Sequence, residues 1–174
     1  MAIAMTLQQY LDDKHIDYDV MTHERTENSS RAAQASHVPG DRLVKAVILS
    51  REGGFIAALI PASCKVRLDA VRELVDGPVA LSSEDEIEDL FPDCDRGAIP
   101  PLVNAYGIDM IVDERLGLEN GQGDGKADDV YFEAGDHQSL IHLTGRQFRE
   151  LLREVPCAPI ADRPGRQTVP QQLA

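Results

Sequence analysis

The sequence predicts an α/β (α+β) domain, built around a mixed or largely antiparallel sheet. Two observations favour this class: strand-like segments outnumber long helices, and short turns join the members of two strand pairs. A third observation excludes a common alternative. Neither the G-x-G-x-x-G nor the G-x-x-x-x-G-K-[ST] phosphate-binding motif occurs, so a doubly wound nucleotide-binding sheet is not expected.

The amino-terminal part of the chain predicts two helices with a strand between them. Thr6 is expected to cap a helix that runs to residue 16, because apolar residues follow it at helical spacing. Residues 18–22 suit a short strand. Residues 28–30 are expected to cap a second helix over 31–35, before a Pro-Gly pair breaks it.

A β-hairpin is predicted next. Residues 43–49 read as a buried strand with a single polar residue, and residues 55–60 return as a second apolar strand. The Glu-Gly-Gly sequence at 52–54 supplies the turn between them.

The middle of the chain predicts a helix over 66–75, a short strand over 79–81 and an acidic helix that ends at residue 91. Ser83 and Glu86 have the S-x-x-E spacing of a capping box, which marks the start of the acidic helix. Its carboxylates, from residue 84 to residue 89, are interpreted as a solvated face.

The remaining elements end in a predicted tail. The expected strands cover residues 108–112, 130–133 and 139–143. A glycine-rich surface turn is expected over 117–125, and Thr144 caps a helix that ends at Arg153. Residues 156–174 contain four prolines and few large apolar residues, so we expect one domain over residues 1–155 and a frayed, flexible tail over 156–174.

Composition excludes several classes of protein. The chain has 174 residues, 43% of them apolar, and its net charge of −13 argues against a protein that coats DNA non-specifically. No apolar stretch reaches the ~20 residues that span a bilayer, and no secretory signal is evident. The three cysteines are far apart and form no CxxC pair, which excludes a disulfide scaffold and a four-cysteine zinc site. We expect a cytoplasmic protein with no metal, cofactor or membrane partner.

Lys45 is the residue that fits the predicted core least well. Successive strand side chains alternate between faces, so Lys45 shares a face with Leu43 and Val47. Both faces of this strand are apolar, and a buried charge is costly, so chemistry or a partner should compensate the amine. The alternative stays open that the aliphatic stem lies on the core while the amine reaches water.

A positive band surrounds this lysine. Residues 31–67 contain six basic and two acidic residues, whereas residues 68–133 contain four basic and 18 acidic residues. The contrast indicates a candidate anion-binding surface, and ordinary solvated charge is the alternative interpretation.

Three segments carry a resemblance to a known family: Lys45 in its strand, the loop Gly97-Ala-Ile-Pro-Pro101, and the turn Gly135-Asp-His137. Their order and spacing resemble the YbaK/prolyl-tRNA synthetase editing-domain family over about residues 23–152. Its members are small stand-alone or synthetase-appended aminoacyl-tRNA deacylases. The resemblance implies a compact single domain whose mixed, mostly antiparallel sheet curls around a pocket.

The resemblance also implies a reaction, hydrolysis of the ester that joins a wrong amino acid to the terminal ribose of a tRNA. Lys45 matches the family's functional lysine and would position the substrate, while Gly97 and Ala98 would belong to the catalytic loop. Backbone N–H groups of this loop would stabilise the oxyanion, at ~2.7–4 kcal/mol per donor. The implied substrate-binding residues are Ile99, Pro100, Pro101, Gly135 and His137.

Aminoacyl-tRNA is therefore the expected partner, with an aminoacyl-tRNA synthetase as a second one. Under this hypothesis one patch beside Lys45 binds the tRNA, and it consists of Arg31, Arg42, Lys65 and Arg67.

One residue departs from the family's pattern. Many members carry serine just before the loop proline, where this chain has Pro100. Proline has neither an N–H group nor a hydroxyl, so the oxyanion donors are restricted to residues such as Gly97, Ala98, Ile99 or Leu102. No general base is evident, and the resemblance suggests that the substrate's ribose hydroxyl and a bound water share that work.

Alternative interpretations remain at this point. A rigid turn explains residues 97–101, and a structural role explains His137. The whole chain could instead be a non-catalytic module that binds a tRNA acceptor end or a small acyl ligand, or a hydrolase of small esters. The net charge of −13 keeps both alternatives open, because affinity for tRNA normally needs charge that neutralises phosphates.

Overall fold

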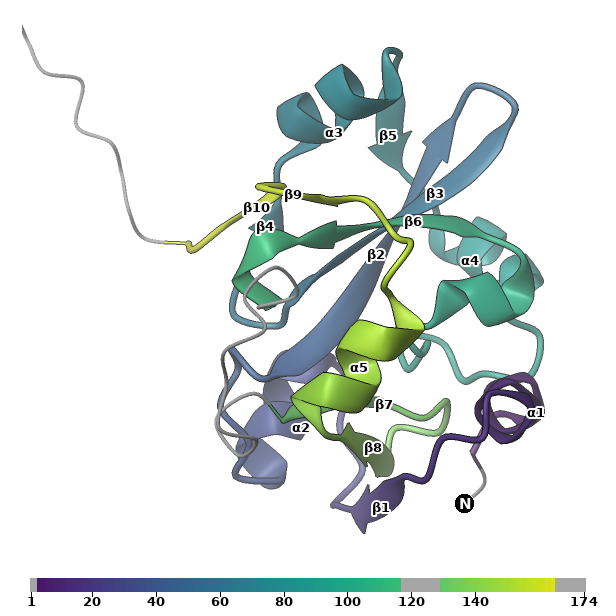
Figure 1. The fold of residues 1–174 in the computed structure, drawn as a ribbon, viewed down its shortest axis with the longest axis vertical. Coiled ribbons are helices and arrows are strands. Elements are labelled where there is room, and N and C mark those ends of the chain that lie inside the picture. The colour runs from purple at the N-terminus through teal and green to yellow at the C-terminus, as the bar shows by residue number, and fades with distance from the viewer. Residues whose placement is uncertain (1–2, 117–128, 165–174) are drawn as a thin grey trace, which may run out of the picture.

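The structure is a computed structural model that describes residues 3–116 and 129–164 (Figure 1). Its helices are α1 (Met5–Asp13), α2 (Ser29–Ala35), α3 (Leu68–Val75), α4 (Glu84–Leu90) and α5 (Gly145–Leu151), with two 3-10 helices, η1 (Val103–Tyr106) and η2 (Glu114–Leu116). Its strands are β1 (Asp19–Thr22), β2 (Leu43–Arg51), β3 (Gly54–Pro61), β4 (Lys65–Val66), β5 (Val79–Leu81), β6 (Asp109–Asp113), β7 (Val130–Glu133), β8 (Ser139–Leu143), β9 (Cys157–Ala158) and β10 (Ala161–Asp162).

Within these residues, eight strands form one sheet in the order β1-β8-β7-β2-β3-β6-β9, and β5 also pairs with β2. The pairs β1–β8, β7–β8, β2–β3 and β2–β5 are antiparallel, whereas β2–β7, β3–β6 and β6–β9 are parallel. The predicted mixed, mostly antiparallel sheet is confirmed. The glycine-rich turn predicted at 117–125 lies outside the described residues.

Three helices begin where the sequence predicts. The side chains of Asn28, Ser83 and Thr144 each accept a hydrogen bond from a backbone N–H in the first turn of α2, α4 and α5. The last two are complete capping boxes, which satisfy two otherwise unpaired N–H groups at each helix start.

The first helix begins differently from the prediction. Thr6 does not cap α1, which starts at Met5 without a side-chain cap from Ala4. The N–H of Thr6 donates to the carboxylate of Asp93 at 2.8 Å instead. The side chain that caps the start of α1 therefore lies 87 residues away in the sequence. A pattern of neighbouring residues cannot indicate such a cap.

The sheet is buried on both faces, as the apolar pattern of β2 predicts. On one face, Val44 belongs to the cluster that contains Phe148 of α5 and apolar side chains of α1. On the other face, Leu43 packs with Ala32 of α2, and a separate cluster contains Val71 of α3. Figure 1 accordingly shows α5 in front of the sheet and α2 behind it. None of the helices in the described residues is long and apolar enough to cross a membrane.

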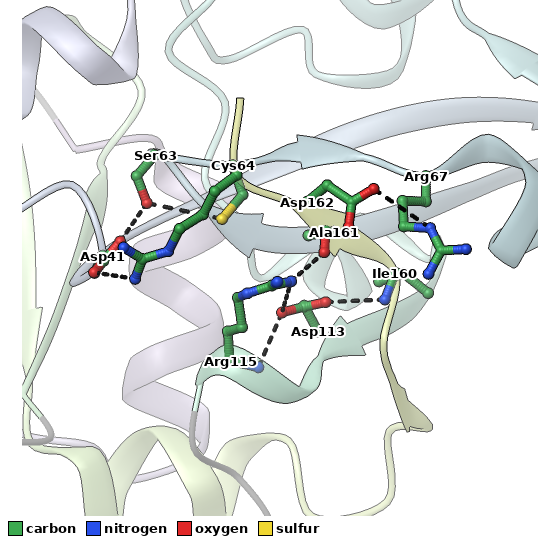
Figure 2. Close-up of polar contacts among 10 residues, drawn as sticks. Asp41, Ser63, Cys64, Arg67, Asp113, Arg115, Ile160, Ala161 and Asp162 are labelled. Atoms are coloured by element: carbon green, nitrogen blue, oxygen red, sulfur yellow. Dashed lines mark hydrogen bonds and ion pairs between the residues drawn. The ribbon is translucent and has the colours of Figure 1, made fainter. Parts of the chain in front are cut away.

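The segment after α5 does not form the expected frayed tail where it is described. We call residues 157–163 the C-terminal strap: its strands β9 and β10 pair with β6 and β4, and Ile160 between them is fully buried. Asp113, itself fully buried, accepts hydrogen bonds from the N–H groups of Ile160 and Arg115, both at 2.9 Å (Figure 2). The folded unit therefore continues past residue 155 at least to residue 162, and residues 165–174 lie outside the described part of the chain.

The buried carboxylate of Asp113 should matter for stability. Asp113→Ala leaves the buried N–H of Ile160 without its acceptor, so we expect a loss of about 2–4 kcal/mol in the free energy of unfolding, measured by urea denaturation. Asp109→Ala is the matched control on the same strand. Asp109 is exposed and pairs with Arg51 at the surface, so its loss should stay within about 1 kcal/mol. Equal losses for both variants would contradict this account of the strap.

Candidate functional site

One edge of β2 is only partly paired. β7 pairs with this edge up to Val44, and β5 pairs with it only from Leu49. The N–H and C=O groups of successive strand residues point to alternate edges, and the carbonyl of Ile48 accepts the N–H of Ser82 on this side. The main chain of Ala46 therefore faces the same edge, where none of the described strands lies opposite it.

A cavity of about 290 Å³ opens at this gap. Its lining comes from residues 45–48 of β2, from Leu81, Ser82, Glu84 and Ile87 of the β5–α4 region, from Gly97 and Ile99, and from Ser29 at the start of α2. A larger hollow of about 470 Å³ next to β6 contains none of the residues that the sequence predicts for a site. The smaller cavity is the candidate site.

Lys45 is a half-buried part of the cavity wall. Its Nζ donates to the carbonyl of Ala62 at 3.5 Å, in the turn after β3. Burial lowers the pKa of the amine, the nearby Cys64 thiol opposes this effect, and Lys65 adds to it. In the described part of the chain no carboxylate forms an ion pair with Lys45. The amine is thus positioned by the fold without being neutralised.

The loop after α4 forms the facing part of the wall. Gly97 has a φ of +83°, and a Cβ at this position would lie 3.3 Å from Cε1 of His137 and 3.4 Å from the carbonyl oxygen of Glu27. Only glycine therefore fits without a shift of its neighbours. His137 is buried and hydrogen-bonds the Arg96 carbonyl through Nε2, so its imidazole supports the loop from behind and does not line the cavity.

Four other residues predicted for the site lie behind the cavity wall. Ala98, Pro100 and Pro101 are buried and do not line it. The N–H of Ala98 donates to the carbonyl of Asp95 at 3.1 Å, so it is not available to an oxyanion. Gly135 does not line the cavity either, and its carbonyl accepts the N–H of Asp95 at 2.8 Å. These residues shape the loop instead of facing the hollow.

The four basic residues predicted to bind tRNA differ in their surroundings. Arg31 pairs with Glu27 at 3.3 Å, and Arg67 pairs with Asp69 at 3.2 Å and with Asp162 at 3.6 Å. Arg42 directly precedes β2, and Lys65 is exposed on β4. At least two of the four charges, those of Arg31 and Arg67, are therefore already matched by acidic neighbours, which weakens the attraction they can exert on a phosphate.

Sequence reasoning missed three polar residues of the cavity lining, which are Ser29, Ser82 and Glu84. Glu84 was assigned to a solvated face; it is exposed at the start of α4, but it also lines the cavity. Ser82 belongs to the cavity lining, but its hydroxyl is inaccessible to solvent and has no hydrogen-bond partner among the described residues. The capping box at Ser83 was the available signal, because it fixes where α4 begins beside β2. Among the described residues, no three His, Cys, Asp or Glu side chains gather as a metal site.

The sequence also matches a known family over most of its length. The model of the aminoacyl-tRNA editing domain family matches residues 23–151. The chain belongs to this family. The match covers the gap in β2, the loop at residues 97–101 and the turn that holds His137, so this editing domain contains every part of the candidate site. A sequence search of curated proteins finds no match.

Solved structures share the fold of this editing domain. The hypothetical protein APE2540 is 21% identical, with a TM-score of 0.75 over 90% of this chain and 99% of its own. A protein provisionally described as a trans-editing enzyme for prolyl-tRNA synthetase is 21% identical, with a TM-score of 0.72 over 91% of this chain and 96% of its own. Identities this low show a common fold and nothing about substrates.

The fit of Gly97 against His137 can be tested directly. Gly97→Ala adds both backbone strain and a contact with the imidazole, whereas Gly107→Ala, at a φ of +74° with open space around it, adds strain alone. We expect Gly107→Ala to cost about 1–2 kcal/mol of unfolding free energy and Gly97→Ala to cost more. Chemical denaturation of both variants measures the difference. Equal costs would show that the loop does not rest on His137.

Glu133, at the end of β7, should make stability depend on pH. It is 2% exposed, neither carboxylate oxygen has a partner among the described residues, and burial, followed by the charge of Asp136, raises its pKa to about 7. Between pH 4.5 and pH 7 the unfolded chain loses this proton while the folded chain keeps it, so stability falls as pH rises.

We therefore expect Glu133→Gln to become more stable than the wild type across this window, by about 3 kcal/mol in total. Thermal unfolding of both proteins on either side of the window measures the effect. Parallel pH profiles for the two proteins would contradict a buried, unpaired carboxyl at this position.

Proposed function

We propose that this editing domain hydrolyses the aminoacyl ester of mischarged tRNA in trans, as a cytoplasmic deacylase. Membership of the editing-domain family supports the general editing role. The observation that carries the proposal is that Lys45 and the loop residues Gly97 and Ile99 line one cavity, at a place where β2 leaves its edge open.

Lys45 supplies a positive charge next to the reacting ester. Within the described residues its Nζ donates only to the carbonyl of Ala62, so it can also donate to the substrate's carbonyl oxygen or to a terminal phosphate. Because the N–H of Ala98 is engaged by Asp95, Gly97 and Ile99 are the loop residues that face the cavity and offer N–H groups to an oxyanion. In enzymes with an oxyanion hole, each such donor contributes ~2.7–4 kcal/mol to transition-state stabilisation.

Water is the only reactant that this hydrolysis needs besides the aminoacyl-tRNA. Water gives up one proton to the general base as it adds to the ester carbonyl carbon, and the negative charge develops on the carbonyl oxygen, where Lys45 and the loop stabilise it. The bond to the ribose oxygen then breaks, and that oxygen takes up a proton, which releases the free amino acid and the tRNA. The ribose hydroxyl beside the ester and a bound water share the role of general base.

The expected partners are aminoacyl-tRNA and an aminoacyl-tRNA synthetase. The net charge is −13, and at least Arg31 and Arg67 of the four basic residues form ion pairs, so affinity for tRNA should be modest and salt-dependent. The same ion pairs favour a second candidate, a hydrolase of small aminoacyl esters without RNA. That enzyme would turn over RNA-free esters at rates that depend little on salt.

Lys45→Met tests the proposal, because it keeps the aliphatic stem and removes the amine. We expect a drop of about 10–100-fold in the deacylation rate, the loss that one charge-assisted hydrogen bond causes. Rates are measured over a matrix of mischarged tRNAs. Lys14→Met is the control, since Lys14 is exposed at the end of α1. Full activity of Lys45→Met would reject this mechanism, and binding of charged tRNA without any turnover would favour a non-catalytic module.

A further inference from the structure

The amine of Lys45 depends on one acceptor for its position. A lysine side chain has a flexible four-carbon stem, so its ammonium group stays in place only where a partner holds it. In the described part of the chain, Nζ of Lys45 donates to the carbonyl of Ala62 at 3.5 Å and forms no ion pair with a carboxylate. The contacts that fix the Ala62 carbonyl therefore also fix the place of the amine.

The carbonyl of Ala62 belongs to a peptide group with little freedom. The N–H of Ala62 donates to the carbonyl of Leu43 at 2.8 Å. Because a peptide bond is planar, the direction of the Ala62 carbonyl is tied to that of the N–H of Ser63. This N–H donates to the carbonyl of Gly40 at 3.3 Å. The turn after β3 is thus held against the loop at residues 39–42, which precedes β2.

The side chain of Ser63 makes a second contact with the same loop. Its Oγ donates to Oδ1 of Asp41 at 2.5 Å (Figure 2). The other carboxylate oxygen of Asp41 accepts a hydrogen bond from Arg163 of the C-terminal strap at 2.6 Å. The hydrogen bond from Ser63 lowers the pKa of Asp41; desolvation opposes this effect, and the charge of Arg163 adds to it. The carboxylate is thus ionised and holds both donors at once.

We propose that Ser63, Asp41 and Arg163 are positioning residues for the amine of Lys45. The contacts run from the strap, through Asp41 and Ser63, to the peptide group whose carbonyl accepts the hydrogen bond of the amine. The C-terminal strap then belongs to the site, although none of its residues lines the cavity. The inference rests on the proposed function only in treating this amine as the group that meets the substrate.

These contacts should matter more for the position of the amine than for stability. The side chains of Arg163 and Asp41 are 60% and 47% exposed, and an ion pair this exposed contributes little to folding. A displacement of ~1 Å in a positioned group, in contrast, can lower a reaction rate by about 100-fold. Variants of the three residues should therefore fold normally and still misplace the amine.

The pKa of Lys45 tests the inference without any catalytic assay. The probe is acetic anhydride, and its rate of reaction with Lys45 is followed against pH by peptide mass spectrometry on the full chain. Burial lowers the pKa of this amine, the Cys64 thiol opposes the effect, and Lys65 adds to it. An amine released from Ala62 turns towards solvent, so its pKa should rise towards the ordinary value for lysine.

Three variants should each cause this rise: Ser63→Ala, Asp41→Asn and Arg163→Gln. Asp41→Asn removes a negative charge and Arg163→Gln removes a positive one, so a direct electrostatic effect would shift the pKa of Lys45 in opposite directions. Misplacement of the amine raises it in both, and in Ser63→Ala, which changes no charge. Shifts of opposite sign, or no shift in any of the three, overturn the inference. Arg163→Lys keeps a cation beside Asp41 and should retain the wild-type pKa.

Asp162→Asn is the matched control on the strap. Asp162 precedes Arg163 and pairs with Arg67 at 3.6 Å, and within the described residues its side chain contacts neither Asp41 nor Ser63. We expect the pKa of Lys45 to stay unchanged in this variant. A rise as large as that in Arg163→Gln would show that any weakening of the strap suffices, which overturns the specific contacts proposed here. Thermal unfolding of every variant checks that it folds.

Deacylation kinetics separate this inference from the proposed function. Misplacement of the amine should lower kcat by about threefold or more with KM unchanged, because the amine stabilises charge that develops in the transition state. If the pKa shifts appear and the wild type hydrolyses no mischarged tRNA, only the proposed function is rejected. If the wild type hydrolyses mischarged tRNA and all three variants keep its kcat, the positioning role is overturned and the proposed function stands.

Discussion

The interrupted pairing of β2 is the constraint on which the rest of the structure depends. A strand buried on both faces normally finds partners for every backbone N–H and C=O group. Here β7 separates from β2 after Val44, and β5 joins it only at Leu49. The interval between them contains Lys45 and Ala46. A charged side chain and main-chain groups that face no described strand therefore come together where α2, α4 and one loop can enclose them. The cavity therefore arises from the gap in the pairing of β2, and residues of α2 and α4 complete its wall.

Both walls of this cavity are supported by residues that do not enter it. On one side, His137 packs behind Gly97 and holds the loop through the Arg96 carbonyl. On the other side, Lys45 donates to the carbonyl of Ala62. The adjacent Ser63 donates to Asp41, a contact that Figure 2 shows. Asp41 also pairs with an arginine of the C-terminal strap at 2.6 Å. The geometry of the site is thus determined by packing around it, which limits how far its polar groups can relax.

Structural features that depend on neighbouring residues could be predicted from the sequence. Features that depend on contacts between residues far apart in the sequence could not. The capping boxes of α4 and α5 and the alternation along β2 depend on residues a few positions apart. The cap of α1 by Asp93 and the hydrogen bond from the N–H of Ile160 to Asp113 join residues that are far apart in the sequence, so short segments of sequence do not reveal them. The same holds for the cavity. Lys45 stood out because it is polar among apolar neighbours, whereas Ser82 looks like any loop serine until β5 pairs with β2.

The C-terminal strap has a consequence for how the chain folds as it is made. β9 and β10 are translated last of the described strands, yet they pair with β6 and β4 from the middle of the chain. During synthesis, one edge of β6 therefore has no partner until β9, at residues 157–158, has been made. Such an exposed edge can pair with other chains, so the late synthesis of β9 leaves an interval in which the nascent chain is prone to aggregate.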